Sequence, residues 1–159
     1  MKNIKKQQGF SIIELLIVIA IIVLLAGISV IALNSQQAKA RDAKRINDIR
    51  QIRTALEFYS SDEAQYPVEA KPIVLGSKEK EKLCNKASGG FTSLETECAA
   101  EAIYMTKVPQ DPQNNEQYIY TGTAKGYDIT FKTEKDSSLG VAGVYHAHSD
   151  IIDQSLGNR

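Results

Sequence analysis

Residues 9–33 read GFSIIELLIVIAIIVLLAGISVIAL, and this apolar run is the strongest structural signal in the chain. The 19 residues from Leu15 to Leu33 are all apolar except Gly27 and Ser29. As an α-helix they would measure roughly 28 Å, close to the ~30 Å hydrocarbon core of a bilayer. The run is also longer than the apolar region of a removable signal peptide. The sequence therefore predicts a transmembrane segment over residues 15–33 that stays attached to the chain.

The helical pattern continues beyond this apolar run. Apolar residues recur in steps of three or four, at Ile46, Ile49, Ile52, Leu56 and Tyr59, and no proline or glycine interrupts the segment. We predict one helix over residues 10–60, apolar all round in its first half and carrying one apolar stripe in its second. Only the stripe requires a soluble partner.

Residues 61–159 are polar and mixed, and they predict a globular head. The Tyr66-Pro67 and Lys71-Pro72 pairs predict a loop, and the charged segment 78–86 predicts an exposed surface. Strand patterns occupy residues 118–121 and 127–133, with a hairpin turn between Gly122 and Gly126, and a third strand is expected over 141–146. The predicted fold is α+β, with the long helix packed on a small antiparallel sheet.

The two cysteines, Cys84 and Cys98, both lie in the predicted head. Neither belongs to a C-x-x-C or Cys/His metal pattern. A disulfide between them would contribute about 3 kcal/mol and fit an extracytoplasmic location. Two unpaired thiols are the alternative.

The chain begins with a short basic segment containing Lys2, Lys5 and Lys6, followed by QQGFSIIEL over residues 7–15. This sequence resembles the type IV pilin and pseudopilin family, whose members have a glycine before a cleavage site, a phenylalanine after it and a glutamate five residues into the mature chain. The resemblance implies that prepilin peptidase removes leader residues 1–9 between Gly9 and Phe10, that Phe10 is N-methylated, and that the chain has the pilin fold.

Glu14 is a carboxylate at the edge of an apolar helix. An unpartnered carboxylate in such surroundings costs several kcal/mol, and ionisable groups in membrane helices are usually functional. The resemblance implies that Glu14 pairs with the Phe10 amine of a neighbouring subunit and thereby sets the axial register. The alternative is that Glu14 only reaches the water at the membrane interface.

The resemblance also implies a location and partners. The precursor would cross the cytoplasmic membrane once, with its head outside, and identical subunits would then form a helical cell-surface fibre with the help of the pilus assembly machinery. The positive-inside rule does not decide the orientation, because basic residues also follow the apolar run, at Lys39, Arg41, Lys44 and Arg45. The cleavage motif and the cysteines favour an external head.

The segment Val108-Pro109-Gln110-Asp111-Pro112 resembles the V-P-x-D-P loop of pseudopilins, some of which bind calcium after it. Oxygen donors suited to calcium follow here, at Asp111, Asn114, Asn115 and Glu116. The aromatic-glycine pair usual after the second proline is missing, so a turn stabilised by Asx hydrogen bonds is the favoured interpretation. We expect no cofactor, with calcium as the alternative.

Two further groups were weighed as binding sites. A basic stripe could contact DNA, but acidic residues interrupt it and favour an ion-paired, solvated face or contacts between subunits; its members are Lys39, Arg41, Lys44, Arg45, Arg50 and Arg53. His146 and His148 share a strand face, but no Cys or third His lies near them in the sequence, so we expect no metal site.

No catalytic motif is apparent, and basic and acidic residues balance at 19 each, which gives no global attraction to nucleic acid. We therefore expect a structural protein and not an enzyme. The first hypothesis is a subunit of a type IV pilus-like fibre. The alternatives are a pseudopilin of a type II secretion system and a membrane-anchored module that binds a ligand or DNA.

Overall fold

The computed structural model describes residues 10–154, except for the side chains of residues 28–32. The predicted leader, residues 1–9, lies outside the described part. The first element is the 52-residue helix α1 (Ile12–Glu63), which extends slightly past the predicted end at residue 60. The chain divides into two compact units at the Gln37–Ala38 junction, so α1 contributes to both.

The predicted membrane span over residues 15–33 includes the stretch 28–32, whose side chains are not described. Within the described residues, no helix has the length and apolarity that crossing a membrane requires.

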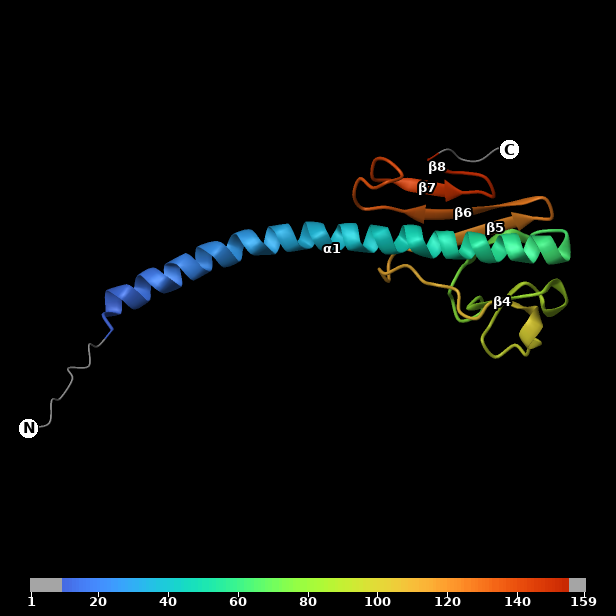
Figure 1. Cartoon of the computed structure of the whole chain (residues 1–159), viewed down its shortest axis with the longest axis horizontal. Coiled ribbons are helices and arrows are strands. Elements are labelled where there is room, and N and C mark those ends of the chain that lie inside the picture. Colours follow the sequence, from blue (N-terminus) through green and yellow to red (C-terminus); the bar gives the residue numbers. More distant parts are fainter. Residues whose placement is uncertain (1–9, 155–159) are drawn as a thin grey trace, which may run out of the picture. The chain divides into compact units, whose positions relative to one another are not determined.

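The head contains two antiparallel sheets, coloured green to red in Figure 1. The larger has the strand order β1-β5-β6-β7-β8, with β1 Glu69–Val74, β5 Ile119–Thr123, β6 Gly126–Lys132, β7 Val144–Ala147 and β8 Ile152–Asp153. The smaller has the order β3-β2-β4, with β3 Phe91–Thr92, β2 Lys82–Cys84 and β4 Ile103–Met105. Two short 3₁₀ helices complete the head, η1 Lys86–Ser88 and η2 Ala100–Ala102.

One hydrophobic core joins the second half of α1 to both sheets. The apolar stripe predicted from the sequence is buried, with Ile49, Ile52 and Leu56 completely inaccessible. It packs against residues from both sheets, among them Leu83, Phe91, Tyr118, Tyr120, Ile129, Phe131 and Tyr145. The head therefore has the predicted α+β, pilin-like arrangement of a helix covering an antiparallel sheet (Figure 1).

The structure corrects two predictions about the segment between α1 and β5. The expected loop around Lys71-Pro72 belongs to strand β1. Proline is tolerated there because β1 is an edge strand, and its register against β5 shifts between Glu69 and Ile73. The segment 78–86, expected on the surface, contains the fully buried strand β2.

The β5–β6 hairpin is tighter than predicted. Thr123 pairs with Gly126, so only Ala124 and Lys125 form the turn, and Gly122 lies inside strand β5. A Cβ on Gly122 would overlap the backbone carbonyl of Pro67 and the hydroxyl of Tyr120. The Tyr120 hydroxyl donates a hydrogen bond to that carbonyl at 2.7 Å, so the glycine leaves space for a contact that holds the chain after α1 against the sheet.

Candidate functional site

Glu14 stabilises the first turn of its own helix. The backbone amide of Ser11 donates a hydrogen bond to Glu14 Oε2 at 3.0 Å, and the amide of Leu15 donates to the Ser11 carbonyl at 3.2 Å. Ser11 precedes the first helical residue, so Ser11-Ile12-Ile13-Glu14 matches the S-x-x-E pattern of a capping box. The three-residue spacing of Ser11 and Glu14 indicates this role in the sequence, but the capping box was not among the expectations.

The helix that follows exposes apolar side chains on every side. Every large apolar residue from Phe10 to Leu25 is between 47% and 85% exposed. Monomeric soluble proteins rarely expose contiguous apolar patches larger than a few hundred Å². This segment therefore needs an apolar environment that the described part of the chain does not provide.

The two predicted assembly residues described by the structure lie at the accessible end of this helix. Phe10 and Glu14 are both exposed, whereas Gly9 lies outside the described residues. Only one carboxylate oxygen of Glu14, Oε2, has a hydrogen bond in the described chain. A negative charge in the first turn of a helix is favoured by the helix dipole.

In the head, the most prominent polar group is a buried cluster around Arg45. The Arg45 guanidinium forms salt bridges with Asp42 at 2.8 Å, Asp111 at 2.7 Å and Glu134 at 2.7 Å. Arg41 Nε donates a second cationic contact to Glu134 at 2.7 Å. Asp42 also accepts hydrogen bonds from the backbone amides of Glu134 and Lys135. The cluster thus ties α1 to the loop before β5 and to the loop after β6.

Hydrogen bonding decides the charges in this cluster. Burial by itself lowers the pKa of Arg45, but hydrogen bonds to Asp111, Glu134 and Asp42 outweigh burial and raise that pKa above its ordinary value. Hydrogen bonding from Arg41 lowers the pKa of Glu134 to about 2, against the opposing effect of burial and with further help from Arg45. Arg45 and Glu134 are therefore both charged at neutral pH.

The predicted calcium ligands are mostly engaged elsewhere. Both Asp111 oxygens accept hydrogen bonds from Arg45, and Oδ1 also accepts one from the Gln113 amide at 2.8 Å, which is the Asx turn that the sequence analysis favoured over calcium binding. Glu116 forms an ion pair with Lys132 at 2.9 Å, and Asn114 and Asn115 are exposed. Across residues 10–154, excluding the undescribed side chains, no group of three or more acidic, histidine or cysteine side chains could hold a metal.

The predicted basic stripe does not form one solvated surface. Arg45 pairs with the interrupting acidic residue Asp42, and Arg41 pairs with Glu134, so the expected ion pairing is present. Arg45 and Asp42 are buried, however, which contradicts the expectation of a solvated face. Arg53 donates to the Ser149 carbonyl at 2.9 Å. The remaining members, Lys39, Lys44 and Arg50, are exposed.

The two histidines form a small polar group on the larger sheet. His146 Nδ1 lies 3.1 Å from each carboxylate oxygen of Asp128, on the neighbouring strand β6. The His148 ring stacks on the His146 ring, and its Nδ1 lies 3.2 Å from the Tyr127 carbonyl. The group joins β6 to β7.

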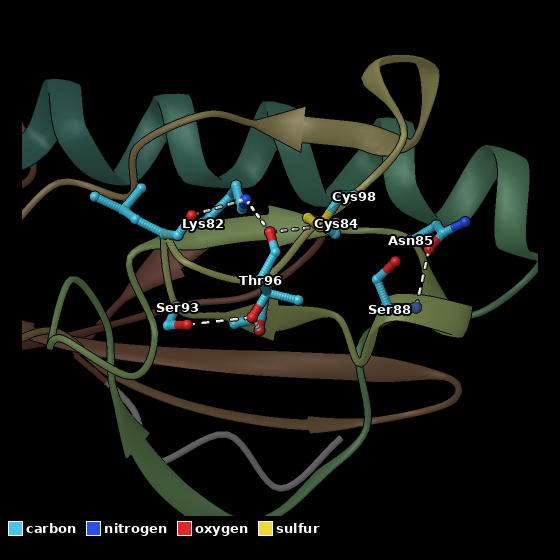
Figure 2. The surroundings of a disulfide bond; sticks show 9 residues. Lys82, Cys84, Asn85, Ser88, Ser93, Thr96 and Cys98 are labelled. Carbon is cyan, nitrogen blue, oxygen red and sulfur yellow. Dashed lines mark hydrogen bonds between the residues drawn. A yellow bond between two sulfur atoms is a disulfide. The ribbon is translucent and has the colours of Figure 1, made fainter.

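Cys84 and Cys98 are joined by a disulfide in the structure, with their Cα atoms 6.4 Å apart. Figure 2 shows the loop that this bond closes. Lys82 Nζ donates hydrogen bonds to the carbonyls of Leu94 and Thr96, and the Thr96 hydroxyl bonds the hydroxyls of Thr92 and Ser93 (Figure 2). These hydrogen bonds to the loop explain why Lys82 can be buried in β2, which the sequence pattern did not suggest.

Comparison with protein families finds two matches that together span most of the chain. Residues 4–30 match the prokaryotic N-terminal methylation motif. Residues 32–151 match the family described as type II secretion system (T2SS), protein G.

Curated proteins give the same result over the full length. The chain is 30% identical to a type II secretion system core protein G of Vibrio cholerae over 144 residues, 90% of each chain. It is 27% identical to the protein of that name from Escherichia coli K12, over 100% of this chain and 99% of the relative. The corresponding Klebsiella pneumoniae protein is 25% identical over 98% of this chain and 99% of its own. No solved structure matches significantly.

Proposed function

Because the chain belongs to the type II secretion system protein G family, we propose that it is a pseudopilin: a structural subunit that polymerises through its N-terminal helix into the fibre of a secretion system. Of the hypotheses drawn from the sequence, the comparisons favour this alternative over the type IV pilus subunit that was placed first. Both hypotheses describe the same kind of building block. They differ in the machine that uses it.

The observation that carries the proposal is the uncovered apolar surface from Phe10 to Leu25. At about 25 cal/mol per Å² of apolar surface removed from water, packing such a surface against copies of itself is strongly favourable. A bilayer would supply the same apolar environment before assembly. The proposal therefore includes a precursor anchored in the cytoplasmic membrane with its head outside.

The match over residues 4–30 supports the expected processing of this precursor. Prepilin peptidase would cleave between Gly9 and Phe10, and N-methylation would follow on the new terminal amine of Phe10. Phe10 is 84% exposed in the described chain, which is compatible with such chemistry. The processed subunit would then enter the fibre with the assembly machinery of the secretion system.

Glu14 would have two successive roles. In the single subunit it caps its own helix through Ser11, and in the fibre its carboxylate would also pair with the terminal amine of a neighbouring Phe10. Such a pair fixes register more than it adds stability, because removing two charges from water offsets much of their attraction.

A matched pair of Glu14 substitutions tests this proposal. Glu14→Gln keeps a carbonyl oxygen that accepts the Ser11 hydrogen bond but removes the charge, whereas Glu14→Ala removes both. We expect both variants to be cleaved normally and both to fail in fibre assembly and in secretion of a substrate protein. The measurements are immunoblots of processed subunit, sheared fibre and secreted protein in a strain that lacks the native chain.

A Gly9 variant with a bulky side chain serves as the processing control. It should accumulate as uncut precursor and form no fibre. Normal fibre and secretion from Glu14→Gln would refute the charge-pairing role, and normal assembly of the uncut Gly9 variant would refute the proposed function itself.

A further inference from the structure

An open groove of about 370 Å³ lies between the second half of α1 and strand β4. Strand β4 contributes Tyr104 and Met105 to its lining. Helix α1 contributes the polar residues Arg50, Gln51 and Thr54 and the apolar residues Ala55 and Phe58. Phe58 is 63% exposed, although Ala55 and Tyr59 on the same helix are buried. Large apolar side chains in an open groove are characteristic of sites that receive a partner.

Arg50 gives the groove a charge. Its side chain is exposed, and it has no ion pair with any residue that the structure describes, unlike Arg41 and Arg45 on the same helix. A partner that fits the groove should therefore combine an apolar side chain with a negative charge.

The disulfide-closed loop of the head presents this combination. Leu94 is 48% exposed, and the neighbouring Glu95 and Glu97 are exposed and form no ion pair within residues 10–154. The loop backbone is held by the Cys84–Cys98 bond and by the hydrogen bonds from Lys82 (Figure 2). A loop held in one conformation loses little entropy when it binds.

Exposed apolar residues elsewhere in the head fit the groove less well. Val68, Val141 and Val144 are not flanked by two unpaired carboxylates, and Ile151 has only Asp150 beside it in an exposed turn. None of them lies within the disulfide-closed loop, residues 84–98.

We propose that the Leu94 loop of one copy of this chain docks into the Arg50–Phe58 groove of the next copy. Leu94 packs on Phe58 and Met105, and Glu95 and Glu97 face Arg50. Because loop and groove are different surfaces, the contact is heterologous; such a contact does not close as a two-fold dimer, and it extends into an open helical fibre when the rotation between copies does not close a ring. This inference rests on the proposed function and specifies a contact between heads within the fibre.

Charge reversal in the full chain, produced together with its assembly machinery, tests the contact. Arg50→Glu should lower the yield of sheared fibre roughly tenfold, because like charges then face each other. The paired change Glu95→Lys with Glu97→Lys should do the same in the original background, and combining all three substitutions should restore the yield. Lys125→Glu, an exposed reversal in the β5–β6 turn, is the matched control and should leave the yield unchanged.

A crosslinking experiment locates the contact directly. A photoreactive phenylalanine analogue at position 58 should join two copies through the peptide that contains Leu94, as identified by mass spectrometry of assembled fibre. Crosslinks to another segment, or a combined variant no better than the single reversals, would overturn the inference. If Arg50→Glu assembles normally while Glu14→Gln does not, the groove contact is refuted and the proposed function stands.

Discussion

At the scale of single residues, Arg45 shows how a polar group can organise an apolar head. Its side chain is fully buried, yet three carboxylates from three parts of the chain bind it. Removing a charge from water costs several kcal/mol, so the arrangement is stable only while its partners are all present. The cluster therefore specifies where the loops around Asp111 and Glu134 meet α1.

We expect Arg45→Met to lower the free energy of unfolding by about 3–5 kcal/mol, because the substitution leaves Asp42 and Asp111 buried without a cation. The measurement is denaturant unfolding of the full chain in detergent micelles. Arg50→Met, on the exposed side of the same helix, is the control and should change stability by no more than about 0.5 kcal/mol. Equal effects of the two substitutions would show that the cluster contributes nothing specific.

The ionisation of Glu134 predicts a pH dependence. Its pKa falls from 4.5 to about 2 on folding, so the unfolded chain binds this proton more readily. The resulting stabilisation is complete above about pH 4.5 and is lost as the pH falls towards 2. Burial raises the pKa of Asp48, which acts in the opposite direction, so the contribution of Glu134 must be isolated with a variant.

Glu134→Gln provides that isolation. Unfolding free energies measured between pH 6 and pH 2 should fall less steeply for this variant than for the unchanged chain. Parallel curves for the two proteins would contradict the assigned charge state.

At the scale of elements, the sequence predicted what periodicity can reveal and missed what depends on distant contacts. The long helix and strands β5, β6 and β7 follow from spacing and β-branched or aromatic content. Strand β1 was missed because Pro72 normally excludes a strand, and only its place at the sheet edge permits it. Strand β2 was missed because a lysine such as Lys82 usually lies on the surface. Here its ammonium group is buried because it donates hydrogen bonds to the carbonyls of Leu94 and Thr96.

The candidate sites follow the same rule. The processing motif and Glu14 are local patterns that can be recognised in the sequence and stay predictions, whereas the groove beside Phe58 depends on the position of β4 in the fold. The fate of Asp111 also depends on a long-range contact, because Arg45 lies 66 residues away in the sequence. The oxygen donors visible in the sequence therefore do not reveal that Asp111 already forms a salt bridge with Arg45.

The β5–β6 hairpin supplies a matched pair of glycines. Gly122→Ala should destabilise the chain by about 1–3 kcal/mol, because the new methyl group meets the Pro67 backbone and Tyr120. Gly126→Ala is the control, since a Cβ there has no atom within 4 Å. Thermal unfolding of both variants checks this; an equally large loss at Gly126 would contradict the steric explanation.

The disulfide-closed loop is expected to depend on its covalent bond. Replacing both cysteines with alanine should lower the free energy of unfolding by about 3 kcal/mol, as expected for a bond that spans 14 residues. It should also make the 84–98 segment more sensitive to protease in the folded chain. An unchanged denaturation midpoint and cleavage pattern would show that the hydrogen bonds of Lys82 hold the loop without help.

At the scale of the whole molecule, the chain combines a head that buries its own core with a helix start that exposes apolar side chains throughout. The head explains how the subunit folds, and the exposed helix explains why it assembles. Two separate family models match these parts, one over residues 4–30 and one over residues 32–151. Cleavage would give the exposed helix a free amine on Phe10, close in sequence to Glu14, whose carboxylate caps the helix.

Intact-mass analysis and N-terminal sequencing of the chain taken from sheared fibre test this account most directly. The expected product begins at Phe10 and is heavier than the unmethylated, disulfide-bonded residue 10–159 chain by one CH2, because a methyl group replaces one amine hydrogen. Assembled chains that still carry residues 1–9 would contradict this function, because Phe10 would then have no free amine to pair with Glu14 of a neighbouring copy.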